Sequence, residues 1–64
     1  MKRRDVERHL RALGCQLHHH GGNHDIWHNP LTNVQAAVPR HTEINRPLLA
    51  AICRQLGIAP PAGN

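Results

Sequence analysis

The stretch Gly21-Gly22-Asn23-His24 decides the fold of this 64-residue chain, because it predicts a tight turn that leads directly into a histidine. Glycine adopts a positive φ without strain, and a two-residue hairpin turn requires a positive φ, so we expect the two glycines to form the turn. The runs on either side, 15–20 and 24–29, each have the length of a strand. We therefore predict a β-hairpin in which backbone pairing holds His24 at the tip.

The register of this hairpin follows from the position of its turn. With the two glycines at its centre, the hairpin places Leu17 opposite Ile26 and His19 opposite His24. Cys15 and Leu17 alternate with polar residues, which predicts that the first strand is half buried.

Length and charge limit what such a chain can do. A chain of 64 residues forms one small domain and buries too little surface to enclose a deep substrate cavity. Its 8 Lys and Arg residues outnumber its 4 Asp and Glu residues, which gives a formal net charge of +4. This excess favours a polyanion or an acidic protein as partner, although plain soluble domains also carry such charge. We expect any functional site to be a shallow basic surface.

The two cysteines, Cys15 and Cys53, form neither a CxxC pair nor a zinc-finger spacing. Both fall at apolar positions, which predicts small buried hydrophobic residues in a reducing compartment; a disulfide between them is the alternative. The basic N-terminus is not followed by an apolar segment, and no apolar run is long enough to span a membrane. We therefore expect a cytoplasmic protein that does not contact membranes.

The segment 3–13 has the pattern of a helix that ends at Gly14. Its apolar residues recur at helical spacing and are Val6, Leu10 and Leu13. Three arginines lie along another face of the same helix, and they are Arg4, Arg8 and Arg11. These arginines form either a solvated basic face or a ridge that contacts phosphate groups, and their positions alone do not separate the two interpretations.

A third strand is predicted over 34–38, after the turn residues 29–33. Two hairpin connections in succession produce an antiparallel meander, so the start of the second strand lies beside the end of the third. We therefore expect His24 to be a neighbour of the segment 38–41. Trp27 is the only aromatic residue and is expected in the core, with stacking on a nucleobase as the alternative.

The second helix is predicted between Asn45, a typical N-cap, and Gly57, a typical C-terminal stop, with Pro47 tolerated in its first turn. Its apolar stripe consists of Leu49, Ile52, Cys53 and Leu56. Residues 59–64 have the composition of a flexible C-terminal tail, which leaves 1–58 as the folded domain. The predicted architecture is α+β in the order αβββα, with both helices packed on one face of a three-stranded antiparallel sheet.

Seven histidines raise the alternative of a metal-binding protein. Adjacent residues of a strand point to opposite faces, so within the run 18–20 only His18 and His20 could share an ion. His24 and His28 have the i, i+4 spacing of zinc ligands on a helix, but the sequence around them predicts a strand. We expect no metal site.

Three motifs stand in order along the chain: Gly22-Asn23-His24, Val38-Pro39-Arg40-His41 and the helix end Ile52-Cys53-Arg54-Gln55-Leu56-Gly57-Ile58. Together they resemble the HicA family, also called YcfA-like proteins. Members of that family are small mRNA interferase toxins of type II toxin–antitoxin modules. The resemblance covers 2–58, so we treat 1–58 as a HicA-like toxin domain.

The resemblance implies a fold like that of a double-stranded RNA-binding domain, a ribonuclease activity that needs no metal or other cofactor, and a neutralising HicB antitoxin. It also implies that His24 is the catalytic residue. This sequence departs from the family at two positions, because Asn23 stands where serine is common and His19 where a basic residue is common. A non-catalytic RNA-binding module of the same fold is the alternative function.

The chemistry of RNA cleavage agrees with this implication. A histidine suits the removal of a proton from a 2′-hydroxyl group because the ordinary pKa of histidine lies near neutral pH. Arg40 and the N-terminus of the second helix are candidates to stabilise charge on the phosphate, and His41 is the candidate to protonate the leaving oxygen. The other residues expected to contact RNA are Gly22, Asn23, Arg4, Arg8 and Arg11. The alternative for His24 is a structural hydrogen-bonding residue.

Overall fold

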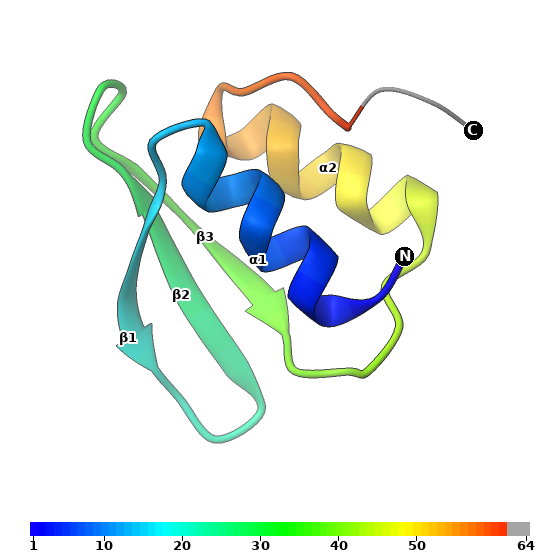
Figure 1. Ribbon diagram of the computed structural model, residues 1–64. Helices are drawn as coiled ribbons and strands as arrows, with labels where there is room; N and C mark the ends of the chain where they lie inside the picture. The colour runs from blue at the N-terminus through cyan, green and yellow to red at the C-terminus, as the bar shows by residue number, and fades with distance from the viewer. Residues whose placement is uncertain (62–64) are drawn as a thin grey trace.

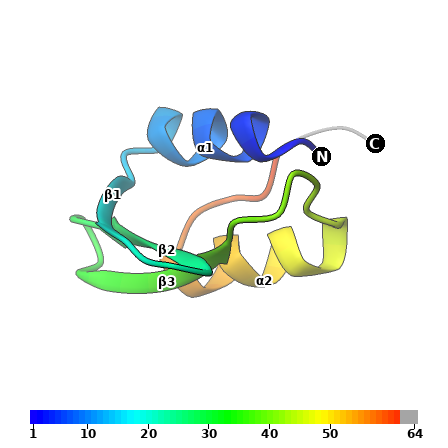
Figure 2. The same cartoon turned by 90° about the horizontal axis from the view of Figure 1, so that it is seen from below.

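Two helices and a three-stranded antiparallel sheet make up the computed structural model, which describes residues 1–61 (Figure 1). The elements are α1 (Arg3–Ala12), β1 (Gln16–His20), β2 (His24–Asn29), β3 (Val34–Pro39) and α2 (Arg46–Leu56). The strands pair in the order β1-β2-β3, so β2 is the central strand. In Figure 2, α1 lies at the top of the view and α2 at the bottom, where α2 contacts β3. This arrangement confirms the predicted α+β fold and its αβββα order.

The helix ends carry the capping residues that the sequence predicts. The Asn45 side chain accepts a hydrogen bond from the backbone N–H of Leu48 at 2.9 Å, which satisfies a free donor at the start of α2. Gly57 ends α2 with a φ of 76°, and a Cβ at this position would lie 3.0 Å from the Thr32 methyl group. An L side chain at Gly57 would therefore be strained both by its backbone and by its neighbour. α1 ends one residue before its predicted end.

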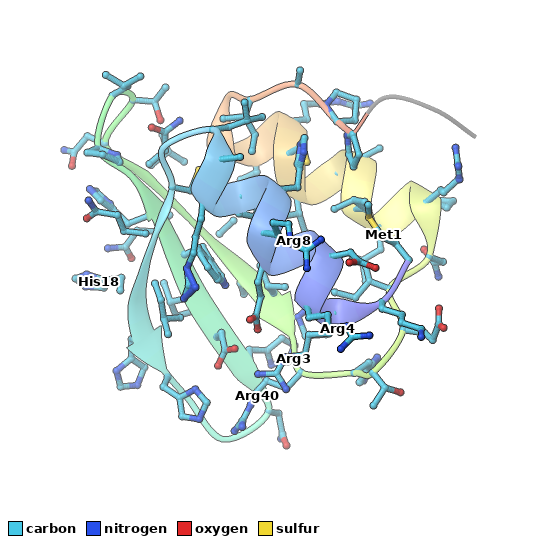
Figure 3. The ribbon with its side chains drawn as sticks, in the orientation of Figure 1. Met1, Arg3, Arg4, Arg8, His18 and Arg40 are labelled. Carbon is cyan, nitrogen blue, oxygen red and sulfur yellow. The ribbon has the colours of Figure 1, made fainter. Side chains whose placement is uncertain are left out.

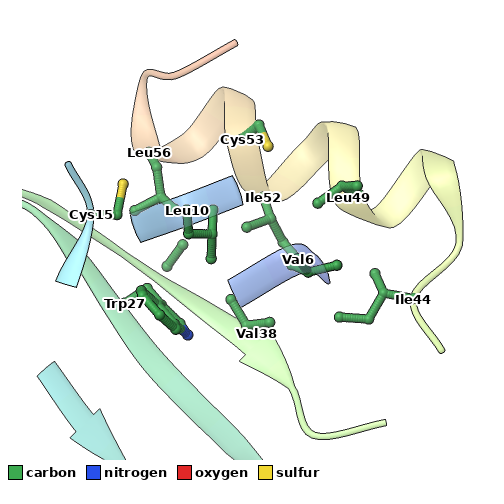
Figure 4. Packing of buried hydrophobic residues seen from close by; sticks show 11 residues of the cluster. Val6, Leu10, Cys15, Trp27, Val38, Ile44, Leu49, Ile52, Cys53 and Leu56 are labelled. Carbon is green, nitrogen blue, oxygen red and sulfur yellow. The ribbon is translucent and has the colours of Figure 1, made fainter. Parts of the chain in front are cut away.

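A hydrophobic core joins the two helices to one face of the sheet (Figure 4). Trp27 of β2 is 1% exposed, so its predicted core position is confirmed and its ring is not available to stack on a nucleobase. The other core residues are Val6, Leu10, Cys15, Ala36, Val38, Ile44, Leu49, Ile52, Cys53 and Leu56. Ile44 is a core residue that its place in a predicted loop did not indicate. Burial of each large apolar side chain contributes about 1.5–3 kcal/mol to folding.

Both cysteines are buried free thiols, as predicted, and the alternative of a disulfide is wrong. Burial raises the pKa of the Cys15 thiol. Burial, together with the nearby Cys15, raises the pKa of the Cys53 thiol. Within residues 1–61, neither helix is long and apolar enough to cross a membrane. Of the predicted tail 59–64, residues 62–64 lie outside the described residues.

The prediction of a half-buried first strand is wrong, because every residue of β1 is exposed. Leu17 is 40% exposed, although its apolar side chain alternates with polar neighbours as in a half-buried strand. β1 is an edge strand, and the strand residues of the core come from β2 and β3. Only Cys15, just before β1, reaches the core from this part of the chain.

The predicted hairpin register is also wrong. Leu17 lies opposite Trp27 rather than Ile26, and His19 lies opposite Ile26 rather than His24. The physical reason is twofold: the turn is displaced by one residue, and β1 contains a bulge.

The bulge lies between Leu17 and His19, where the register shifts by one residue. His18 is the extra residue of β1 at this point. Beyond the bulge, His20 lies opposite Asp25. The position of the turn, rather than the bulge, places His20 opposite Asp25, because this pair lies between the bulge and the turn.

The turn uses its glycines differently from the prediction. The Gly21 N–H donates a hydrogen bond to the His24 carbonyl oxygen at 3.0 Å, so Gly22 and Asn23 are the two central residues. Neither Gly21 nor Gly22 has a positive φ. Glycine is needed at position 21 for a steric reason instead, because a Cβ there would lie 2.5 Å from the His24 carbonyl oxygen. Gly22 faces open space.

Candidate functional site

An open hollow of about 330 Å³ lies at the hairpin tip, and we call it the His24 hollow. Its lining consists of Arg3, Gly22, Asn23, His24, Arg40 and His41. His24 pairs with Pro39 across β2 and β3, and the Arg40 N–H donates to the Asn23 carbonyl oxygen at 3.2 Å. The prediction that His24 lies beside the segment 38–41 is therefore confirmed.

His24 is the first residue of β2, and its side chain is exposed. Its backbone is fixed by the turn and by the pairing with Pro39. Its imidazole makes no hydrogen bond or ion pair with the residues that the structure describes. His9 provides a contrast, because its Nε2 atom lies 2.8 Å from the Ala59 carbonyl oxygen. The alternative of a structural hydrogen-bonding role therefore gains no support at His24.

Arg40 is held across the hairpin tip by backbone carbonyl groups. Its Nη1 donates to the carbonyl oxygen of Gly21 at 3.1 Å and to that of Gly22 at 3.3 Å. The side chain is 33% exposed, so its guanidinium lines the hollow while it is partly shielded from water. Partial shielding strengthens the attraction between this cation and an anion in the hollow.

Asp25, the residue after His24, is a buried carboxylate at the back of the site. Its side chain is 4% exposed. Arg3 Nη2 donates to Asp25 Oδ2 at 3.1 Å, while His20 Nδ1 lies 2.9 Å and Arg40 Nε 3.7 Å from Oδ1. An unpaired charge at such a depth would be costly, so the two arginines are what allow the carboxylate to be buried.

Sequence reasoning missed both Asp25 and Arg3 as site residues. The signal for Asp25 was its spacing, because it alternates with Trp27 and Asn29 on the buried face of β2. A buried acidic side chain is costly unless a cation or hydrogen-bond donor pairs with it, so the sequence could have indicated that Asp25 has such a partner. Arg3 gave no comparable signal, because its partner is 22 residues away in the chain.

The arginines that were predicted to contact RNA from α1 lie outside the His24 hollow. Figure 3 shows Arg4 and Arg8 along α1, with Arg8 farther than Arg4 from Arg40. Arg8 lies 3.7 Å from the carboxylate of Asp5, and the Arg11 guanidinium lies 5.1 Å from the centroid of a Trp27 ring. Arg4 lines a second open hollow of about 470 Å³, whose other residues are Lys2, Arg3, Glu7 and Thr42.

The N-terminus of α2 contributes none of the described residues that line the His24 hollow. In Figure 1 this end of α2 lies away from the β1–β2 turn. The hollow is lined instead by Arg3, from the start of α1.

The remaining histidines do not assemble into a metal site. His18 and His28 have ring centroids 6.0 Å apart. Among residues 1–61, no group of three or more His, Cys, Asp or Glu side chains is arranged to hold a metal ion.

The fold and the hollow define a small basic α+β domain in which an exposed histidine and two arginines line one hollow. Residues 3–58 match the family model of the HicA toxin of bacterial toxin–antitoxin modules. Because the match spans most of the chain, the protein belongs to the HicA toxin family and is a toxin of a toxin–antitoxin module. Neither a search of curated proteins nor a search of solved structures finds a match.

Proposed function

We propose that this toxin is a metal-independent endoribonuclease, an mRNA interferase, with His24 as its catalytic residue. One observation carries the proposal: an exposed imidazole that makes no hydrogen bond or ion pair with any of residues 1–61 lies in the same hollow as Arg3 and Arg40. Cleavage of RNA through the 2′-hydroxyl group needs a base and cationic hydrogen-bond donors, which are the groups that this hollow offers. We place the activity in the cytoplasm.

In the proposed reaction, His24 removes the proton from a ribose 2′-hydroxyl group. The 2′-oxygen then forms a bond to phosphorus while the bond between phosphorus and the 5′-oxygen breaks. Arg40 stabilises the negative charge of the crowded phosphorane. His41 lines the same hollow and donates the proton that the leaving 5′-oxygen needs. The products are a 2′,3′-cyclic phosphate and a 5′-hydroxyl group.

RNA binding extends beyond the reacting phosphate in this proposal. Gly22 and Asn23 contact the nucleotide at the hairpin tip, since both line the His24 hollow. Phosphate groups farther along the RNA strand are contacted by the exposed cations of α1, which are Arg4, Arg8 and Arg11. Their contribution is to affinity rather than to the reaction, because none of them lines the hollow.

The proposed partner is a HicB-like antitoxin that covers the His24 hollow. The hollow is open, and the basic character of the chain favours an acidic patch on the partner. We expect His24 to react with a histidine-modifying reagent in the free toxin and to be protected in the complex. His18, exposed on β1 and outside the hollow, is the internal control. Equal reactivity of His24 in both states would show that the antitoxin binds elsewhere.

The test of the activity compares RNA cleavage by the wild type, His24→Ala and His18→Ala, with a metal chelator present. The two substitutions remove the same side chain from exposed strand positions, but only His24 lines the hollow. We expect His24→Ala to lower the cleavage rate by about 10²–10⁴-fold while RNA binding and fold are retained. The His18→Ala variant should cleave at the wild-type rate.

Two results would contradict the proposal. Cleavage at the full rate by a folded His24→Ala variant would exclude His24 as the catalytic residue. A wild-type protein that binds RNA without cleaving it would instead be a non-catalytic RNA-binding module.

A further inference from the structure

Two arginines from distant parts of the chain converge on one buried carboxylate beside the His24 hollow. Arg3, in the first turn of α1, donates from Nη2 to Asp25 Oδ2 at 3.1 Å. Arg40, which follows β3, has its Nε 3.7 Å from Asp25 Oδ1. Figure 3 shows Arg3 and Arg40 close together at the end of the molecule that carries the β1–β2 turn. Both side chains line the His24 hollow.

Each of these arginines is held at two points and keeps one nitrogen for a ligand. Arg3 uses Nη2 for Asp25 and Nε for Glu7 at 3.2 Å, which leaves Nη1. Arg40 uses Nη1 for two carbonyl groups of the hairpin turn, and its Nε forms an ion pair with Asp25 at 3.7 Å without a hydrogen bond, so no residue among 1–61 hydrogen-bonds Nη2. A guanidinium whose rotamer is fixed before the ligand arrives loses little conformational entropy on binding.

The formal charges of this cluster cancel, because two carboxylates, Asp25 and Glu7, accompany the two arginines. His20, whose Nδ1 lies 2.9 Å from Asp25 Oδ1, adds a positive charge only when it is protonated. A site built to attract RNA by charge alone would not contain a buried Asp25. The carboxylate is instead suited to orient N–H donors toward the hollow.

We propose that Asp25 is a positioning residue that holds Arg3 and Arg40 as a preformed pair of guanidinium groups for the reacting phosphodiester of RNA. Arg3 is then a second phosphate-contacting arginine beside Arg40. This inference rests on the proposed ribonuclease function and deepens it. If Asp25 orients the arginines, its removal should slow cleavage. If the site acts by positive charge alone, removal of this negative charge should not slow cleavage.

The first experiment compares Asp25→Asn with the control Asp5→Asn. Each change removes one negative charge at nearly constant shape, but Asp5 lies on α1 beside Arg8, away from the hollow. If Asp25 orients the arginines, Asp25→Asn lowers kcat by roughly 10–100-fold, because the guanidinium groups are no longer held in place. KM should not rise, because the net positive charge that attracts RNA has increased. The Asp5→Asn variant should stay within about twofold of the wild type in both constants. A folded Asp25→Asn variant with wild-type kcat would overturn the proposal.

The second experiment compares Arg3→Lys with Arg54→Lys; both changes preserve charge, but Arg54 is exposed on α2 and does not line the hollow. A lysine cannot hold two carboxylates and still present a directed N–H to a phosphate. We expect Arg3→Lys to weaken binding of a 2′-O-methylated RNA oligonucleotide by about tenfold, and to lower kcat on ordinary RNA, whereas Arg54→Lys should change neither. This comparison decides the proposal if Asp25→Asn does not fold.

The 2′-O-methylated RNA cannot be cleaved through its 2′-oxygen, so its binding is measured independently of activity. If the wild type fails to cleave ordinary RNA but Arg3→Lys still weakens this binding, the ribonuclease proposal fails and the phosphate site stands. If the wild type cleaves RNA and Arg3→Lys equals the wild type in binding and kcat, the phosphate site is wrong and the ribonuclease proposal stands.

Discussion

The two ends of β2 each bury one polar side chain, and the two side chains find their partners in opposite ways. At the end near the β2–β3 turn, Asn29 is 2% exposed; its Nδ2 donates to the Leu56 carbonyl oxygen at 2.7 Å, and its Oδ1 accepts from the Leu31 N–H at 3.0 Å. At the other end, Asp25 is paired with two arginine side chains that line the His24 hollow.

We propose that this difference separates a structural polar residue, Asn29, from a functional one, Asp25. The partners of Asn29 are backbone groups that are fully used in joining α2 to the β2–β3 turn. The partners of Asp25 are side chains that keep N–H groups for a ligand. We therefore expect changes near Asp25 to affect activity more than stability, and a change at Asn29 to do the reverse.

The largest effect is expected from Arg40→Gln, which removes a charged donor from the hollow. The cleavage rate should fall by roughly 10²-fold, because a donor to the developing phosphorane is lost. The salt dependence of RNA binding should weaken by about 0.7 in slope, as expected for one phosphate contact to a single strand. Arg8→Gln removes the same charge from α1 and should leave the cleavage rate within about twofold. Equal cleavage rates for the two variants would show that Arg40 in the hollow contributes no more to the reaction than Arg8 on α1.

A loss of stability without a loss of activity is expected from Asn29→Ala. The substitution removes both hydrogen bonds of a buried side chain and should lower the free energy of unfolding by about 1–3 kcal/mol in urea denaturation. Cleavage per folded molecule should be unchanged. Asn23→Ala, at the hairpin tip, is the matched control and should change stability little, because Asn23 is exposed. If Asn29→Ala abolishes cleavage in a fully folded protein, the two ends of β2 are not functionally separate.

The smallest effect is expected at alkaline pH, from the two buried thiols of the core, Cys15 and Cys53. The pKa of Cys15 and that of Cys53 are raised above their ordinary value of 9.0 in the folded protein. As the pH rises past that value the unfolded chain loses these protons first, so the free energy of unfolding is constant below it and falls above it. A variant with both cysteines replaced by alanine should show a flatter dependence between about pH 8 and 10. If the pH dependence of the free energy of unfolding is unchanged in this variant, other groups cause the loss of stability at alkaline pH.

Local signals were enough to predict much of this molecule. The N-cap at Asn45 and the C-cap at Gly57 act on neighbouring backbone groups, so each could be read from a few residues. The proximity of His24 to the segment 38–41 followed from topology alone, because it holds for any register of an antiparallel meander.

The part that could not be predicted depends on register and on distant partners. The one-residue displacement of the turn was not indicated by its two glycines, yet it places His20 opposite Asp25, and the bulge at His18 then shifts the register of Leu17 and Gln16. The pairing of Arg3 with Asp25 requires the start of α1 to lie over β2, which tertiary packing decides. The functional cluster therefore had to be seen in three dimensions.

The central claim is that His24 starts cleavage by removing the proton of a 2′-hydroxyl group, and the end groups of the RNA products test it most directly. The measurement is mass spectrometry of the fragments that the wild-type toxin and His24→Ala produce from one RNA oligonucleotide, with a chelator present. We expect 2′,3′-cyclic phosphate and 5′-hydroxyl ends from the wild type, and no such fragments from His24→Ala. Fragments with 3′-hydroxyl and 5′-phosphate ends, or equal fragments from both proteins, would contradict the claim.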